Sequence, residues 1–89
     1  MLGVTGGVPI RSPPVGYSLG AAVTRRLAVE AEEREIRQID LELRTGIGQP
    51  QISRAFSGLR VFTLDEMSAV CDALGLSLLT VIREEMTGR

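Results

Sequence analysis

The stretch QIDLELRTGIGQPQISRAFSG, residues 38–58, decides the fold of this chain. A short, partly apolar helix-forming segment comes first, and Gly46 interrupts it. Glycine adopts the left-handed conformation that ends helices at little steric cost. Pro50 then falls in the first turn of a second helix, where its missing N–H removes no hydrogen bond. The stretch therefore predicts two short helices joined by the tight turn 45–48.

We expect the first of these helices over residues 36–45 and the second over residues 49–57, with Gly58 ending it. In the first helix, Ile36, Ile39 and Leu43 fall on one side and Leu41 falls on another.

Three further helices are predicted outside this stretch. Ser18 is an N-cap candidate for a first helix that continues as a charged run to Glu35. Thr63 and Glu66 have the spacing of a capping box, which begins a fourth helix that Gly75 ends. Ser77 caps the fifth helix. Apolar residues repeat at helical spacing in these helices: Leu19, Ala22, Val23 and Leu27; Leu64, Met67, Val70, Cys71 and Leu74; Leu78, Leu79, Val81, Ile82 and Met86.

The predicted architecture is a single all-α domain of five helices over residues 18–87. A chain of 89 residues is long enough for one modest core. Residues 1–17 contain three prolines and four of the ten glycines, a composition that cannot sustain a helix. We expect these residues to be a flexible N-terminal arm.

Composition argues against catalytic and metal-binding classes. The chain has no histidine and a single cysteine, Cys71, so a Cys/His metal cluster and an internal disulfide are ruled out. No nucleophile and base are recognisable, and we expect neither enzyme activity nor a metal, cofactor or small-molecule ligand. Cys71 lies on an apolar stripe, as a core residue would. No apolar run is long enough for a membrane span and no secretory signal is recognisable, so the expected location is the cytoplasm.

The charge distribution indicates a polyanionic partner. The formal net charge is −1, yet no Asp or Glu lies between Leu43 and Leu64, where Arg44, Arg54 and Arg60 give the stretch +3. A local basic patch on an acidic body is the electrostatic footprint of a nucleic-acid-binding protein.

The start of the predicted helix at residues 49–57 carries hydrogen-bonding side chains of the kind that reads DNA. Glutamine can pair with adenine and arginine with guanine in the major groove. Only the first turns of such a helix reach the base edges, and Ile52 would face the core. The polar residues on these turns are Gln49, Gln51, Ser53 and Arg54.

Residues 38–82 resemble the Cro and phage-repressor group of helix-turn-helix regulators, also called Xre-like. The match to the family pattern needs no gap from Ile36 to Ile82. The resemblance implies a lambda-repressor-like fold and a sequence-specific regulator that binds double-stranded DNA. The likeness is carried by Gln38, Leu41, Thr45-Gly46-Ile47, Gln49, Ile52-Ser53-Arg54, Gly58, Thr63-Leu64 and Ala73-Leu74-Gly75-Leu76-Ser77-Leu78.

The resemblance assigns roles to individual residues. Gln38 matches the family's glutamine that contacts a phosphate and braces the recognition helix. Ser57 and Arg60 match positions that contact the DNA backbone, and Arg44 joins them as the remaining arginine of the acid-free stretch. Proline cannot donate a hydrogen bond, so Pro50 is expected to make only apolar contacts, for instance with a thymine methyl group. The expected base contacts are Gln49, Pro50, Gln51, Ser53 and Arg54.

Two departures from the family pattern are visible. Where the family often pairs an arginine with a glutamate, this chain has Ala31 and Phe56. A small residue opposite an aromatic ring can replace a buried ion pair without loss of stability. Glu42 stands where the family prefers alanine, and two arrangements are open: the helix is rotated so that Leu43 faces inward, or Glu42 pairs with an arginine such as Arg54.

The favoured hypothesis is a phage or prophage Cro/repressor-type regulator that binds a palindromic operator as a homodimer. Leu79, Ile82 and Met86 lie at i, i+3 and i+7 and form a candidate dimer surface. One alternative is the antitoxin of a toxin–antitoxin pair, which a neighbouring toxin gene would indicate. Another is a protein-interaction module that no longer binds DNA, which the net charge and Glu42 favour.

Overall fold

The computed structural model describes residues 18–88 and contains five α-helices. It confirms the all-α, five-helix prediction, and no strand occurs within the described residues. The arm predicted at residues 1–17 lies outside them. The helices are α1 (Leu19–Glu33), α2 (Gln38–Thr45), α3 (Gln49–Phe56), α4 (Leu64–Leu74) and α5 (Leu78–Thr87).

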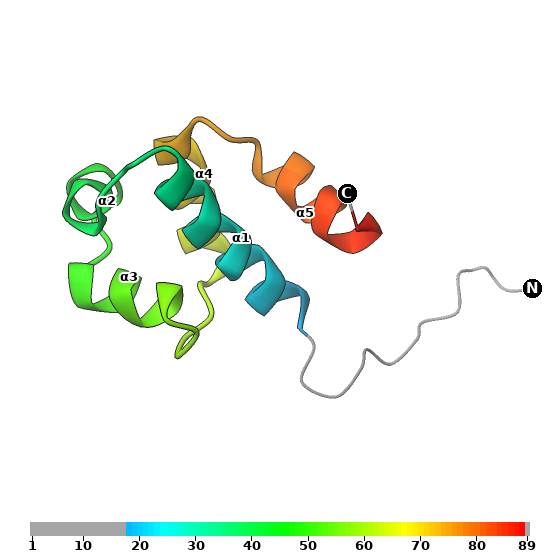
Figure 1. Ribbon diagram of the computed structural model, residues 1–89, viewed down its shortest axis with the longest axis horizontal. Helices are drawn as coiled ribbons and strands as arrows, with labels where there is room; N and C mark the ends of the chain where they lie inside the picture. Colours follow the sequence, from blue (N-terminus) through cyan, green and yellow to red (C-terminus); the bar gives the residue numbers. More distant parts are fainter. Residues whose placement is uncertain (1–17, 89) are drawn as a thin grey trace, which may run out of the picture.

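Helix α1 is central to the packing (Figure 1). It contacts α3, α4 and α5, while α2 packs on α3 and α4, and α4 packs on α5. Helices α2 and α3 lie at one end of the molecule and α5 at the other (Figure 1). The core between the helices is almost entirely aliphatic: Val23, Leu27, Ala31, Leu41, Ile52, Ala55, Phe62, Met67, Val70, Cys71, Leu74 and Val81.

The predicted helix caps are confirmed. The Ser18 hydroxyl accepts the backbone N–H of Ala21 at 3.0 Å. The Thr63 side chain accepts from the Glu66 backbone, and the Glu66 side chain accepts from the Thr63 backbone, which completes the capping box. These bonds satisfy backbone donors that a helix start otherwise leaves without partners.

The boundary between α1 and α2 differs from the prediction. Helix α1 ends at Glu33, and α2 begins at Gln38, two residues later than expected. Glu35 has a positive φ of 57°, and the Ile36 N–H returns to the Ala31 carbonyl at 2.9 Å. Ile36 thereby packs against the core from an extended segment, so its hydrophobic side chain belongs to the turn between the helices.

Helix α2 turns Leu41, and not Leu43, toward the core. Leu41 is fully buried, whereas Ile39 is 47% and Leu43 is 79% exposed. A single leucine therefore anchors α2 between its neighbours α3 and α4, and the arrangement with Leu43 facing inward is wrong.

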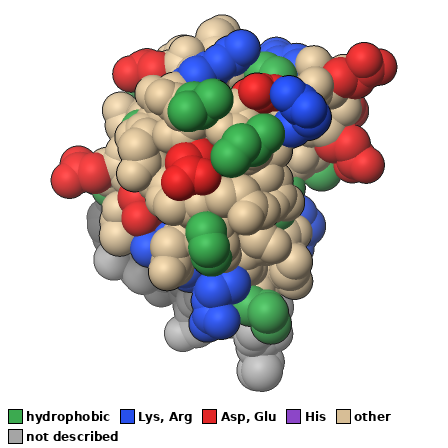
Figure 2. All heavy atoms as spheres, turned by 90° about the vertical axis from the view of Figure 1, so that its left-hand side faces the viewer, with side chains coloured by type: hydrophobic (Ala, Val, Ile, Leu, Met, Phe, Trp, Pro, Cys, Tyr) green, Lys and Arg blue, Asp and Glu red, His purple; other side chains and the backbone are tan. Residues whose placement is uncertain are grey.

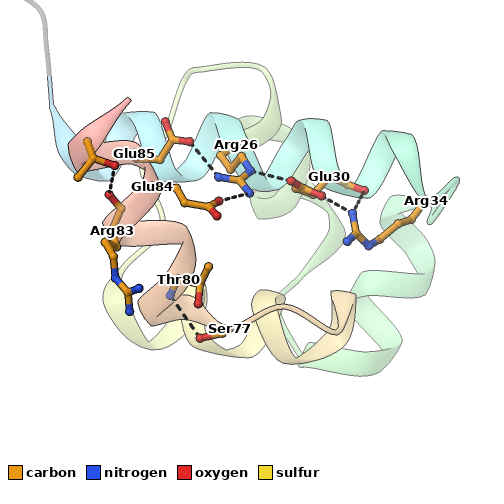
Figure 3. A network of polar contacts seen from close by, with 9 residues as sticks. Arg26, Glu30, Arg34, Ser77, Thr80, Arg83, Glu84 and Glu85 are labelled. Carbon is orange, nitrogen blue, oxygen red and sulfur yellow. Dashed lines mark hydrogen bonds and ion pairs between the residues drawn. The ribbon is translucent and has the colours of Figure 1, made fainter. Parts of the chain in front are cut away.

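A cluster of charged side chains joins α1 to α5 (Figure 3). Arg26 donates to Glu30 at 2.6 Å, to Glu84 at 2.8 Å and to Glu85 at 3.1 Å. Glu30 also pairs with Arg34. The hydrogen bonds from Arg26 and Arg34 lower the pKa of Glu30 below its ordinary value, although burial opposes them. The cluster holds α5 against the middle of α1.

Residues 18–88 contain neither a membrane-spanning helix nor a cluster of metal-binding side chains. No helix there is long and apolar enough to cross a membrane. No group of three or more Cys, Asp or Glu side chains in this part of the chain is placed to hold a metal ion.

Candidate nucleic-acid interface

The turn between α2 and α3 is held by one hydroxyl. The Thr45 hydroxyl donates to the Leu41 carbonyl at 2.7 Å and accepts the Ile47 N–H at 3.1 Å. Gly46 has φ of 80°, a conformation that favours glycine, and its N–H closes α2 onto the Glu42 carbonyl at 2.8 Å. The turn predicted from Gly46 is confirmed, and it fixes the angle at which α3 leaves α2.

Helix α3 exposes one face and buries the other. Ile52 and Ala55 are 0% and 2% exposed, and they hold the helix against the core. Pro50, Gln51 and Arg54 are exposed. The predicted base-reading residues are thus brought together on one helix, and Ile52 faces inward as expected; Gln49 and Ser53 are half-buried, and α3 ends at Phe56, one residue earlier than predicted.

An amide pair connects the starts of α2 and α3. The Gln49 Nε2 donates to the Gln38 Oε1 at 2.7 Å. The bond sets the direction of both amide groups, because each must turn the named atom toward the other. It leaves the Gln49 Oε1 as an acceptor, one N–H of Gln49 as a donor and both N–H groups of Gln38 as donors. The glutamine predicted to brace the recognition helix does contact it.

The arginines of the acid-free stretch differ in their surroundings. Arg54 is exposed, and none of the ion pairs found within residues 18–88 includes it. Arg44 donates one hydrogen bond to the Ala73 carbonyl at 3.2 Å, near the end of α4. Arg60 pairs with Glu66 at 2.9 Å, and the hydrogen bond from Arg60 lowers the pKa of the Glu66 carboxyl. Arg54 is therefore the arginine of this stretch with the most freedom to contact a ligand.

Glu42 does not take the partner considered for it. None of the ion pairs in the described part of the chain includes Glu42, so the suggested pair with Arg54 is wrong. Its side chain is half-buried on α2. Both arrangements considered for this position are therefore wrong. Leu43 is exposed, and Glu42 forms no ion pair within the described residues.

Ala31 and Phe56 replace the family's ion pair by apolar packing, but they do not fill the space. Ala31 is buried and Phe56 is half-buried. Both line an open cavity of about 490 Å³ that also includes Ile36 and Gln38. The Phe56 and Phe62 rings form an edge-to-face pair, with ring centroids 6.1 Å apart and planes at 75°. This geometry is favourable for aromatic pairs, and it ties the end of α3 to the segment before α4.

The end of the molecule formed by α2 and α3 has a mixed surface. Figure 2 shows hydrophobic side chains interspersed with arginines, acidic groups and polar atoms on this face. The arginines of this face are therefore not separated from acidic and hydrophobic groups.

A family model described as helix-turn-helix matches residues 29–81, which is more than half of the chain. This chain belongs to the Xre-like helix-turn-helix family. The match runs from within α1 to within α5 and includes both helices of the motif. The Xre-like protein is accordingly a DNA-binding transcription regulator. No curated protein and no solved structure matches the chain.

The candidate dimer stripe of the Xre-like protein is only partly exposed. Leu79 and Met86 are 67% and 66% exposed, whereas Ile82 is half-buried and packs against the core. Ile82 lines an apolar groove of about 190 Å³ with Leu19 and Leu64. Leu64 is 65% exposed, and sequence reasoning placed it only on the apolar stripe of its helix. The exposed apolar surface therefore extends from α5 toward the starts of α1 and α4.

Sequence reasoning also missed a buried hydroxyl that positions the segment after α3. Thr24 is 2% exposed, and its hydroxyl accepts the Phe62 N–H at 3.1 Å. The signal was present in principle, since Thr24 directly follows Val23 and lies one turn before Leu27 on the apolar side of α1. Threonine at such a position can satisfy a backbone donor from a neighbouring segment.

Proposed function

We propose that this Xre-like regulator is a Cro/repressor-type protein, of phage or prophage origin, that binds a partly palindromic operator as a homodimer. The observation that carries the sequence-specific part is the hydrogen bond from Gln49 to Gln38. It presents a preoriented amide at the first turn of α3, where a recognition helix reaches base edges.

The geometry of the amide pair favours adenine opposite Gln49. Since one N–H of Gln49 is bound to Gln38, the remaining N–H and the Oε1 form a donor–acceptor pair. Adenine offers the complementary N7 acceptor and N6 donor in the major groove. Arg54, exposed on the same helix, suits the two acceptors of guanine. Pro50 and Gln51 stand beside them, and Ser53 is a more peripheral contact because it is half-buried.

Backbone phosphates are expected at both sides of this face. We expect the two N–H groups of Gln38, which its bond to Gln49 leaves free, to donate to a phosphate near the start of α2, where the helix dipole also favours an anion. Ser57 follows the last turn of α3 and is exposed. Arg44 keeps further guanidinium N–H groups beyond its bond to Ala73, while Arg60 contributes its charge from within its pair with Glu66.

The dimer is proposed to form through α5. Leu79 and Met86 protrude from it, and Ile82 joins them from the groove beside Leu64. Helix α5 makes no contact with α3, so a partner on α5 leaves the reading face uncovered. An isologous pair would place two recognition helices on half-sites about 34 Å apart, one turn of DNA.

The proposal is tested by titrating the protein against DNA from its own upstream region and against a scrambled duplex at two salt concentrations. Preferential binding to the upstream DNA is expected, with a loss of about 1–3 kcal/mol in Gln49→Ala and in Arg54→Ala. Ser68→Ala, on the exposed side of α4, is the matched control and should bind as the wild type does. Equal affinity for both duplexes, or none for either, would show that this is not an operator-binding protein.

The dimer is tested separately by analytical ultracentrifugation with and without the operator duplex. Replacing Leu79 and Met86 by serine should give a one-protomer complex on half of the site and weaker binding to the complete site. A double variant that still binds as two protomers with wild-type affinity would place the dimer contact elsewhere.

A further inference from the structure

A pocket of about 260 Å³ lies where the end of α3 meets α1. It is separate from the base-reading residues at the start of α3. None of its lining residues is acidic, and two are arginines from different segments of the chain. The lining residues are Ala21, Thr24, Arg25, Ala55, Phe56, Ser57, Gly58, Arg60 and Val61.

The polar groups of this pocket leave positive charge without a full set of partners. Arg25 is exposed on α1, and none of the ion pairs within residues 18–88 includes it. Arg60 gives its Nη2 to Glu66, while its Nη1 is buried and has no hydrogen-bond acceptor. Ser57 adds an exposed hydroxyl at the rim. One guanidinium without a counter-ion, a second that is half-satisfied and a hydroxyl form a site for an oxyanion.

The position of the pocket matches the width of the DNA groove. Helix α3 has eight residues and is therefore about 12 Å long, the approximate width of the major groove. Gln38 stands beside the start of α3, and Ser57 and Arg25 stand at its end. When α3 lies across the groove, the two ends face phosphates of opposite strands.

We propose that this pocket binds one phosphate of the DNA backbone, with Arg25 of α1 as its principal contact. The Ser57 hydroxyl donates to the same phosphate, and the charge of Arg60 strengthens the local field. This inference rests on the proposed function, since it names a second strand contact for the same reading face. It assigns to α1 a direct part in DNA binding.

The test is the salt dependence of operator affinity in Arg25→Ala, measured by fluorescence anisotropy at several salt concentrations. Each neutralised phosphate contributes about 0.9 to the slope of log affinity against log salt. Because the proposed dimer carries two such pockets, the variant should have a slope lower by about 1.8 per dimer, about 0.9 for each protomer. The preference for operator over scrambled DNA should be unchanged. Ser68→Glu is the matched control: it changes the net charge by the same amount and lies exposed on α4, which makes no contact with α3.

Failure of this inference is distinguishable from failure of the proposed function. If the wild type prefers its operator but Arg25→Ala keeps the wild-type slope, or Ser68→Glu loses as much slope, the pocket is not a DNA contact. If the wild type has no preference, the proposed function itself falls. A further experiment is an NMR titration of the protein with inorganic phosphate in the absence of DNA. If phosphate binds tightly and this binding needs Arg25, while Arg25→Ala leaves the salt slope of DNA affinity unchanged, the pocket binds a free anion and not the DNA backbone.

Discussion

The Nε2 of Gln49 lies 2.7 Å from the Oε1 of Gln38, so the first residue of the recognition helix is bound to the first residue of the helix before it. The two residues are eleven positions apart, and the turn at Gly46 brings them together. The contact restricts the rotation of both amides before DNA arrives, and in the proposed complex this would lower the entropy cost of base readout.

The amide pair predicts energetic coupling between Gln38 and Gln49. Gln38→Ala, Gln49→Ala and the double variant should give losses of operator affinity that are not additive, with a coupling energy of about 0.5–3 kcal/mol. The reason is that either single change already frees the other amide. A double-mutant cycle measured with the operator duplex provides the value. Strictly additive losses would mean that the bond does not contribute to recognition.

Leu41 and Leu43 are two residues apart on α2, and truncation should destabilise the fold at Leu41 but hardly at Leu43. Leu41→Ala removes a fully buried side chain and is expected to lower the free energy of unfolding by about 2–5 kcal/mol. Leu43→Ala removes one that is 79% exposed and should stay within about 0.5 kcal/mol of the wild type. Urea denaturation monitored by circular dichroism measures both. Similar losses in the two variants would contradict the orientation of α2.

The capping box at the start of α4 makes a local contribution to stability. Thr63→Ala leaves the Glu66 N–H without its side-chain acceptor and should lower the free energy of unfolding by about 1 kcal/mol. Ser68→Ala in the same helix is exposed and serves as the control, with no loss expected. Thermal denaturation of the two variants provides the comparison. Equal melting temperatures for Thr63→Ala and Ser68→Ala would show that the cap does not stabilise the protein.

Acid should weaken the fold through Glu30. Hydrogen bonds from Arg26 and Arg34 lower its pKa from the ordinary value of 4.5. The unfolded chain therefore takes up the proton at a higher pH than the folded one, and the stabilisation is fully present above the ordinary value and lost as the pH falls through the folded one. The free energy of unfolding should decline below about pH 5.

The same pH series in Glu30→Gln isolates this carboxyl. An amide does not titrate, so the decline should be shallower, with the remainder due to Glu66 and Asp40, whose pKa values are also lowered by neighbouring arginines. Glu33→Gln changes an exposed residue outside the cluster and should follow the wild-type curve. A Glu30→Gln curve parallel to the wild type would exclude Glu30 as a source of the acid sensitivity.

Features determined by neighbours in the sequence were predictable. The caps at Ser18, Thr63 and Ser77 and the turn at Gly46 depend on residues four or fewer positions apart, and the structure has all of them. The end of α1 was not predictable in this way. A glutamate in the left-handed conformation, as at Glu35, has no sequence signal, because glycine or asparagine is the residue expected there.

Features determined by packing or by distant charges were missed. Ile36, Ile39 and Leu43 have the spacing of one helical side, yet Leu41 is the only buried residue of α2, and Ile36 packs against the core from the turn before the helix. Arg60 belongs to an acid-free stretch in the sequence, but Glu66 reaches it from the first turn of α4. Arg25 was not predicted as a contact residue, because it is distant from Ser57 in the sequence and only the fold brings both to one pocket.

The attachment of α3 by Ile52 and Ala55 has an evolutionary consequence. These two buried residues hold the helix, whereas Pro50, Gln51 and Arg54 contribute nothing to the core. Substitutions at the exposed positions can therefore change the preferred operator while the melting temperature stays almost constant. A regulator built this way can acquire a new target site, and escape cross-talk with a related repressor in the same cell, without first passing through an unstable intermediate.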